Sequence, residues 1–121
     1  MYPSVLLVDD NAEVLGITSD ILQTGDLNVI AAGGAAEAIR IFETKSVEIG
    51  LLVVDLMMPQ MSGYELAQVL RRTNPDLPVL YTSGYSDPPF GLEENSRFIS
   101  KPYSPAMLIA LVKSLISRHV Y

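Results

Sequence analysis

Five polar side chains stand where short apolar runs of this sequence end. They are Asp9, Asp10, Asp55, Ser83 and Lys101. Three carboxylates brought together carry about three negative charges, and such a cluster stays ionised only when a cation is supplied. Mg²⁺ prefers hard oxygen ligands of this kind and uses one or two carboxylates together with waters and a phosphate oxygen. Lys101 adds one positive charge, so a site with Mg²⁺ is close to neutral.

A near-neutral site of this kind can accept a phosphoryl group, which carries about 1.5 to 2 negative charges. A carboxylate is a competent nucleophile for forming an aspartyl-phosphate, while Mg²⁺, the Lys101 ammonium and the Ser83 hydroxyl can stabilise the transferring oxygens. Taken singly, each residue also has a structural interpretation. Asp10 can cap a helix because Glu13 follows three residues later. Asp55 can cap a turn, Ser83 can be a turn hydroxyl, and Lys101 can be a surface charge.

Short apolar runs alternate with helical patterns along the chain, and runs of this kind suit parallel strands that are covered on both faces. The expected strands span residues 5–8, 27–31, 50–55, 79–82 and 98–100. The expected helices span residues 11–24 and 35–43, a segment from the capping box Ser62–Glu65 to Asn74–Pro75, and a segment after Ser104–Pro105. A strand and helix order repeated about five times predicts an α/β fold with helices on both faces of a parallel sheet.

In such a sheet the chemistry collects beyond the carboxyl ends of the strands, where the strand order switches. We therefore expect the five polar side chains to converge there. One stretch, residues 84–95, breaks the pattern because Asp87-Pro88-Pro89 and Gly91 interrupt any regular period. It is expected to be a loop with at most a turn or two of helix.

Length and composition exclude several function classes. A chain of 121 residues with 49% hydrophobic and 18% charged residues is typical of one globular domain. The chain has no cysteine, which excludes disulfides and thiolate metal sites and fits the cytoplasm. A net charge of -6 argues against nucleic-acid binding, and the basic pair Arg71–Arg72 is expected to face solvent. Neither a membrane span nor a signal peptide is expected.

Four blocks of the sequence resemble the receiver domain of response regulators, the phospho-acceptor module of two-component signalling. The blocks are Val5-Leu6-Leu7-Val8-Asp9-Asp10-Asn11, Val53-Val54-Asp55-Leu56-Met57-Met58-Pro59-x-Met61-x-Gly63, Pro78-Val79-Leu80-Tyr81-Thr82-Ser83-Gly84-Tyr85 and Lys101-Pro102. The resemblance covers essentially all of residues 1–121. It implies a flavodoxin-like, doubly wound sheet of five parallel strands in the order 2-1-3-4-5. The short span between the third and fourth blocks departs from the family pattern and predicts a shortened or irregular fourth helix.

The resemblance also implies a role for each site residue. Asp55 is the implied phospho-acceptor, and Asp9 and Asp10 are the implied metal-binding acids. The main-chain carbonyl of Met57 is expected to join Asp55 in binding Mg²⁺. Lys101 is expected to pair with the phosphate.

Ser83 and Phe98 are the implied switch residues. Thr82 is the neighbouring hydroxyl, but counting five residues from Pro78 selects Ser83, and the alternation of a strand turns Thr82 to the other face. A new dianion on the acceptor attracts the Ser83 hydroxyl, the loop moves inward, and the Phe98 ring turns into the vacated space. The resemblance further implies a cis peptide bond before Pro102.

Two more positions influence the lifetime of the phosphate in this family. They are Met57, two residues after the acceptor, and Tyr85, two residues after the switch hydroxyl. Neither side chain orients a water well, so slow self-dephosphorylation is expected. The Tyr-Thr-Ser-Gly-Tyr-Ser stretch and the truncated helix resemble receivers attached to hybrid histidine kinases. The dimerisation surface of the family is not carried over, and a monomer or weak dimer is expected.

The expected function is therefore a receiver that takes a phosphoryl group from phosphohistidine on a histidine kinase or a phosphotransfer protein. It is expected to assist its own phosphotransfer without being a turnover enzyme and to contact neither nucleic acid nor membrane directly. A phosphatase similar to the haloacid dehalogenases is one alternative, but it needs a second acid where Met57 stands. A pseudo-receiver that is never phosphorylated is the other alternative, and the complete set of acids, hydroxyl and lysine opposes it.

Overall fold

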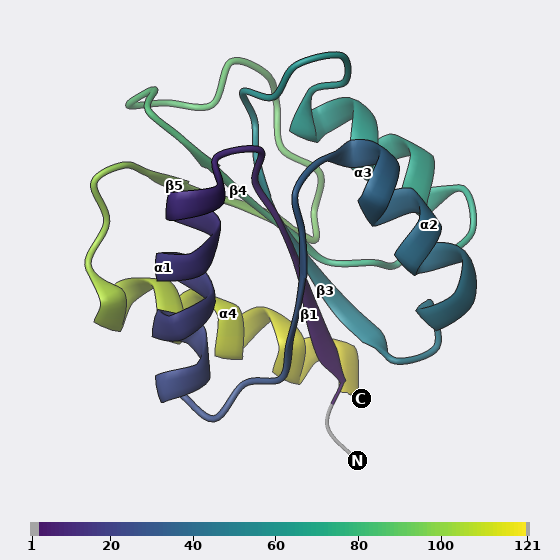
Figure 1. The fold of residues 1–121 in the computed structure, drawn as a ribbon, viewed down its shortest axis with the longest axis horizontal. Helices are drawn as coiled ribbons and strands as arrows, with labels where there is room; N and C mark the ends of the chain where they lie inside the picture. The colour runs from purple at the N-terminus through teal and green to yellow at the C-terminus, as the bar shows by residue number, and fades with distance from the viewer. Residues whose placement is uncertain (1–2, 121) are drawn as a thin grey trace.

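The short apolar runs form the strands of one parallel sheet. A computed structural model describes the backbone of residues 3–120 and the side chains of residues 3–116. The strands are β1 (Ser4–Val8), β2 (Val29–Ala32), β3 (Ile49–Asp55), β4 (Val79–Ser83) and β5 (Ser96–Ser100). They lie in the order β2-β1-β3-β4-β5, and every neighbouring pair is parallel (Figure 1). The predicted flavodoxin-like strand order is confirmed.

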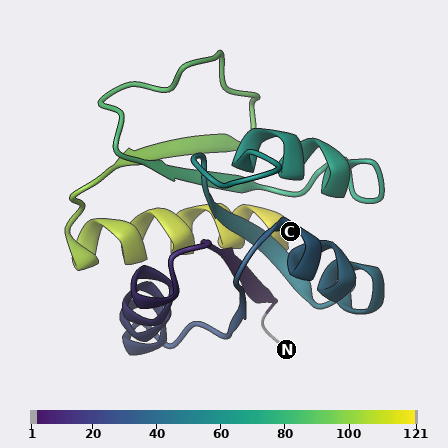
Figure 2. The same ribbon diagram turned by 45° about the horizontal axis from the view of Figure 1, so that its top comes forward.

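The helices cover the sheet in pairs. They are α1 (Ala12–Thr24), α2 (Ala35–Lys45), α3 (Gly63–Arg71) and α4 (Pro105–Val120). The α1 and α4 helices pack on one face and α2 and α3 on the other (Figure 2). Leu6 and Val54 point to the α2/α3 face, whereas Val5 and Val53 point to the α1/α4 face. Because β3 and β4 are buried on both faces, their sequences show no polar alternation.

The segment between β4 and β5 differs from the expected repeat of five strands and five helices. Residues 84–95 run as bends and turns, so the structure describes four helices rather than five. The predicted irregularity is confirmed, and it goes further than a shortened helix. Pro88 and Pro89 explain the difference because proline has no amide hydrogen and biases the preceding residue toward an extended conformation.

Three strands lie within one residue of their expected bounds, and the other two begin two residues away from the expected start. The β2 strand begins at Val29 instead of residue 27, after a turn in which Asp26 has a φ of 63°. The β5 strand begins at Ser96, two residues earlier than expected. Ser96 is a buried polar residue whose hydroxyl accepts a hydrogen bond from Arg71 Nη2 at 3.1 Å, so no apolar pattern marks this start.

The register of the sheet brings several strand ends to one edge. Val8 lies opposite Val54, and Asp55 lies opposite Thr82. In the pairing of β4 with β5, Ser83 lies opposite Ser100. Polar residues that end or follow β1, β3, β4 and β5 therefore emerge at the same carboxyl edge. No helix in residues 3–120 combines the length and the apolar character needed to cross a bilayer.

Candidate functional site

Three carboxylates meet at the carboxyl edge of the sheet. Asp9 and Asp10 follow β1, Asp55 ends β3, and one oxygen from each lies within 4.8 Å of the others. Asp9 and Asp55 are buried, whereas Asp10 is exposed. Oxygen ligands at this spacing suit a hard divalent cation, so these three residues could hold Mg²⁺.

Main-chain hydrogen bonds orient the two buried acids in the same way. Asp9 Oδ1 accepts the Asn11 N–H at 2.9 Å, and Asp55 Oδ1 accepts the Met57 N–H at 3.1 Å. Each acid thus bonds the main chain two residues on, as aspartates in turns do. The second oxygen of each acid faces Lys101, whose Nζ lies 3.3 Å from Asp55 Oδ2 and 3.7 Å from Asp9 Oδ2.

The pKa of Asp9 depends on its burial and on the charges around it. Burial raises the pKa of Asp9 above its usual value. The Asn11 N–H opposes this rise, the negative charge of Asp55 adds to it, and the ammonium of Lys101 opposes it again. The net direction is upward, and burial is its main cause. By formal charge, the three carboxylates exceed the one ammonium by two. The cluster has capacity for another cation.

The alternative role of Asp10 as a helix cap is wrong, because Asn11 is the N-cap of α1. The Asn11 Oδ1 accepts the main-chain N–H groups of Glu13 at 3.0 Å and Val14 at 3.1 Å. Because a neighbour satisfies the first turn of the helix, the carboxylate of Asp10 remains available at the edge of the site.

The α3 helix begins against the main chain of Asp55. Ser62 caps it and forms the predicted capping box with Glu65. A Cβ atom on Gly63 would lie 2.5 Å from the Asp55 carbonyl oxygen, so only glycine allows this close approach. The Gly63 N–H also donates to the Leu56 carbonyl at 3.1 Å. These contacts fix both ends of the loop that follows the acid.

The β4 strand supports the lysine through its main chain. The Lys101 N–H donates to the Ser83 carbonyl at 2.7 Å, and the peptide bond between Lys101 and Pro102 is cis. The Ser83 side chain is fully buried, and its Oγ accepts the Tyr85 N–H at 3.1 Å. Within residues 3–116, no hydrogen bond joins the Ser83 hydroxyl to Asp55. The lysine and the acids are brought together, and the serine hydroxyl bonds the loop instead.

The other residues predicted to take part differ in exposure. Phe98 lies on β5 opposite Tyr81 and is half-buried against the α2/α3 face of the core. Met57 is 60% exposed and Tyr85 is 48% exposed. Both side chains are therefore accessible to solvent.

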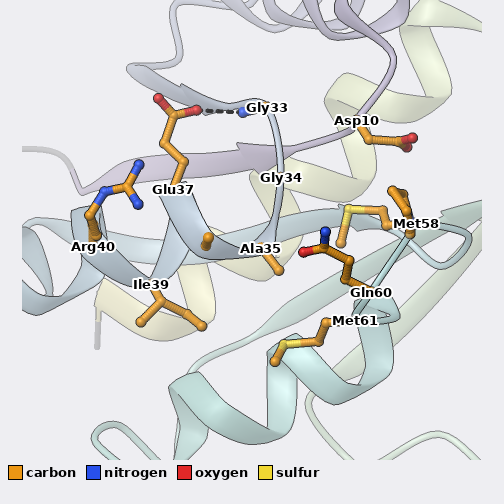
Figure 3. A pocket seen from close by; sticks show the side chains of 12 residues that line it. Asp10, Gly33, Gly34, Ala35, Glu37, Ile39, Arg40, Met58, Gln60 and Met61 are labelled. Carbon is orange, nitrogen blue, oxygen red and sulfur yellow. Dashed lines mark hydrogen bonds between the residues drawn. The ribbon is translucent and has the colours of Figure 1, made fainter.

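A cavity of about 590 Å³ adjoins the acidic cluster at Asp10. It lies between the turn after β2 and the loop after β3, and Ile39, Met58 and Met61 give it an apolar side (Figure 3). Glu37, on its rim, turns back to accept the Gly33 N–H at 2.6 Å (Figure 3). The lining includes neither Asp9 nor Asp55 nor the lysine, so the cavity is a neighbour of the site and not its centre.

The sequence patterns did not predict a second group of polar residues at the amino ends of β4 and β5. We call it the Arg71 network, and it consists of Gln68, Arg71, Glu93, Asn95 and Ser96. The Arg71 side chain is 10% exposed, so its expected position on the solvent side is wrong. A signal was present, because Arg71 follows the buried Ala67 by four residues and therefore shares its helix face.

The comparisons with known proteins place these observations in a family. Residues 5–113 match the model of the response regulator receiver domain. The chain is 32% identical over 119 residues to the sensor kinase CckA of Brucella abortus, covering 95% of this chain and 13% of that protein. It is 36% identical over 118 residues to the probable transcriptional regulator ycf27 of Porphyridium aerugineum, covering 94% of this chain and 48% of that protein.

A solved structure agrees with these sequence relatives. The receiver domain from the hybrid histidine kinase CckA has a TM-score of 0.82 at 28% identity, and the match covers 93% of this chain and 98% of that chain. The chain spans less than half the length of the two curated relatives. Since the family model matches most of the sequence and the strand order is the one expected, the chain belongs to the response regulator receiver domain family.

Proposed function

We propose that this receiver takes a phosphoryl group from phosphohistidine onto Asp55 in a Mg²⁺-dependent reaction and then changes its surface for a partner. The observation that supports this most is the position of Lys101. Its ammonium lies 3.3 Å from Asp55 Oδ2 and 3.7 Å from Asp9 Oδ2, within a cluster of three carboxylates. One cation is thus fixed beside the proposed acceptor, and the uncompensated acids favour a second.

The donor set fits Mg²⁺ because it offers carboxylate oxygens. Asp9, Asp10 and Asp55 would hold the ion together with the main-chain carbonyl of Met57. When bound, Mg²⁺ supplies charge neutralisation and polarises a phosphoryl oxygen. The chain itself contributes the orientation of the acids, since the N–H groups of Asn11 and Met57 hold one oxygen of each buried carboxylate.

In the transfer step, a carboxylate oxygen of Asp55 attacks phosphorus. The new O–P bond forms as the P–N bond to the donor imidazole breaks, and the electron pair of the P–N bond returns to the imidazole nitrogen. The Lys101 ammonium, already beside the acceptor, pairs with the phosphoryl oxygens as their charge is placed on Asp55. The domain assists the transfer but keeps the product, which is how a signalling domain differs from a turnover enzyme.

The proposed switch starts from the hydroxyl of Ser83. Its oxygen accepts the Tyr85 N–H, and a phosphate on Asp55 would offer its O–H a charged acceptor. Movement of Ser83 shifts the segment that follows β4, and the ring of Phe98 turns into the space that is released. Phe98 has no hydroxyl, so packing alone distinguishes its two orientations.

We also propose a long-lived phosphate. Met57 and Tyr85 are both exposed, and neither carries the carboxylate or amide that would orient an attacking water. Replacing Met57 with Asn is expected to shorten the lifetime of the phosphorylated protein, followed by the decay of its mass signal. An unchanged lifetime would contradict this role for the position.

The partner is proposed to be a histidine kinase or a histidine phosphotransfer protein in the cytoplasm. The relatives include a sensor kinase and a probable transcriptional regulator, so receivers like this one occur in both kinds of protein. The net charge of -6 argues against direct contact with nucleic acid. We propose that the domain is a monomer or weak dimer and contacts no membrane itself.

The deciding experiment is phosphorylation by acetyl phosphate with and without Mg²⁺, followed by intact-mass measurement and peptide mapping. We expect the mass of one phosphoryl group to be gained at Asp55 only when Mg²⁺ is present. Asp55→Asn is the matched control and should gain nothing. Sustained release of phosphate from many substrates would support the phosphatase alternative, and a folded protein that is never modified would support the pseudo-receiver.

A further inference from the structure

The loop that carries Lys101 is anchored at its two ends by neighbours in the fold. We call residues 101–104 the Lys101 loop, and it connects β5 to α4. At its start the Lys101 N–H donates to the Ser83 carbonyl. At its end Ser104 Oγ accepts the Met107 N–H at 3.0 Å and so caps α4. Neither of these two hydrogen bonds involves α1, the helix that follows Asp9 and Asp10.

Tyr103, in the middle of this loop, makes a contact with α1. Its hydroxyl lies 3.2 Å from Thr18 Oγ1, and the two residues are 85 positions apart in the sequence. Thr18 is 5% exposed, and the Tyr103 ring packs against the α1/α4 face of the core. The bond joins a buried hydroxyl to one on a half-buried ring, and its loss would leave the buried Thr18 hydroxyl without this partner.

The bond joins the two parts of the chain that carry opposite charges in the site. The α1 helix begins directly after Asp9 and Asp10, with Asn11 as its cap. The Lys101 loop carries the cation that faces Asp9 Oδ2 and Asp55 Oδ2. Because the lysine side chain is long and flexible, the position of its ammonium depends on where its main chain is held.

We propose that Tyr103 is a positioning residue for phosphoryl transfer. Through its hydrogen bond to Thr18 it holds the Lys101 loop against α1 and keeps the ammonium beside Asp55. Small displacements of a charged group from the reacting atoms lower a rate substantially, whereas they change the stability of the fold little. The inference rests on the proposed phosphorylation of Asp55.

The test compares phosphorylation rates with acetyl phosphate at saturating Mg²⁺, followed by intact mass. Tyr103→Phe removes only the hydroxyl, and Thr18→Val removes the partner while keeping a branched side chain of the same size. Each is expected to slow modification by about three- to tenfold, the range set by one lost hydrogen bond. The double variant should be no slower than either single variant. Thr18→Ser keeps a hydroxyl and should restore most of the rate.

Repeating the Tyr103→Phe substitution in a Lys101→Ala variant distinguishes positioning of the lysine from a merely structural role of Tyr103. In Lys101→Ala, where there is no ammonium to place, Tyr103→Phe is expected to have no further effect on the rate. Tyr64→Phe is the matched control, because Tyr64 lies on α3 at the other face of the sheet. It should leave the phosphorylation rate unchanged. Thermal melts of all variants verify that each remains folded.

The outcomes are distinguishable. If the unsubstituted protein is not modified at all, the proposed function fails. If it is modified and Tyr103→Phe reacts at the same rate, the inference about Tyr103 is overturned and the proposed function stands. An equal slowing by Tyr103→Phe in the presence and absence of the lysine would also overturn it, since the hydroxyl would then act on the fold and not through Lys101.

Discussion

Two clusters of charged residues lie at opposite edges of the same sheet and differ in how their charges are paired. At the carboxyl edge, three carboxylates lie together and Lys101 pairs with two of them, Asp9 and Asp55, while no ion pair within residues 3–116 reaches Asp10. At the amino edge, Arg71 pairs with Glu93 at 3.2 Å and makes several hydrogen bonds, although its Nη1 has no hydrogen-bond partner within residues 3–116. Arg71 Nε donates to the Leu77 carbonyl at 2.9 Å, and its Nη2 donates to Asn95 at 2.8 Å and Ser96 at 3.1 Å.

The pKa values of one acid in each cluster move in opposite directions. Burial raises the pKa of Asp9, and the hydrogen bond and lysine beside it do not cancel that effect. Burial alone would also raise the pKa of Glu93, but its own main chain, Gln68, Arg71 and Ser96 together lower it. Burial thus dominates the pKa of Asp9, whereas hydrogen bonds and Arg71 outweigh burial at Glu93. Excess charge marks the candidate site, and an ion pair held among hydrogen bonds marks a structural element.

The largest expected effect is at the paired cluster. Replacing Arg71 with Met should lower the free energy of unfolding by about 2 to 3 kcal/mol, because it removes three hydrogen bonds and leaves Glu93 without its cation. The Glu93 side chain is 36% exposed, which keeps the loss below that of a fully buried pair. Urea unfolding followed by circular dichroism measures it.

The neighbouring arginine supplies the control for this substitution. Arg72 is exposed, so Arg72→Met should change the free energy of unfolding by less than about 0.5 kcal/mol. If both arginine variants lost the same stability, the network would be no more than a pair of surface charges. The distinction drawn between the two clusters would then be wrong.

The next effect is at the unpaired cluster and concerns Mg²⁺. At a concentration tenfold above its dissociation constant, Mg²⁺ should stabilise the folded protein by about 1.4 kcal/mol. Asp9→Asn should reduce this gain, whereas Arg71→Met should keep it, because the network lies at the other edge. Thermal melts over a Mg²⁺ titration measure both. A gain of the same size in all three proteins would show that the ion binds elsewhere.

Asp9→Asn without Mg²⁺ is expected to raise stability by about 1 kcal/mol at neutral pH, since it removes a buried charge from a repulsive cluster. The advantage should depend on pH. The folded pKa of Asp9 lies above its usual 3.8, so protonation relieves the unsubstituted protein as pH falls through that folded pKa. The difference between the two proteins should therefore shrink on acidification, which urea unfolding at several pH values can follow.

The contribution of Glu93 to the free energy of unfolding is expected to depend on pH in the opposite way. Its folded pKa lies below 4.5, so its contribution is present above pH 4.5 and is lost as pH falls through the lower folded value. Glu93→Gln should therefore destabilise the protein at neutral pH and lose that effect in acid. Matching pH profiles for the Asp9 and Glu93 variants would remove the contrast between the two edges.

The sequence predicted the parts of the molecule that depend on local patterns. The β1, β3 and β4 strands are built on short apolar runs because both faces of the sheet are covered, and the positions of Asp9 and Asp55 follow from where the runs of β1 and β3 end. The start of β5 and the burial of Arg71 were missed, because they depend on hydrogen bonds between residues 24 and 25 positions apart. The direction of the Ser83 hydroxyl also depends on its loop, and no spacing in the sequence encodes it.

The smallest expected effect is at Tyr81, which lies beside the Arg71 network and whose buried hydroxyl has no hydrogen-bond partner within residues 3–116. Burial and the negative charge of Glu93 raise its pKa, so the hydroxyl stays neutral. Its ring packs against Tyr64 at 6.4 Å and Phe90 at 5.3 Å between centroids.

Tyr81→Phe keeps these ring contacts and removes only the unpartnered hydroxyl. We expect the free energy of unfolding to rise by about 0.5 kcal/mol, because a buried polar group without a partner destabilises the folded state. Urea unfolding of Tyr81→Phe and Arg71→Met under identical conditions compares the two effects on the free energy of unfolding. A loss of stability would mean that the hydroxyl is hydrogen-bonded in solution, and the Arg71 network would then extend into the aromatic core.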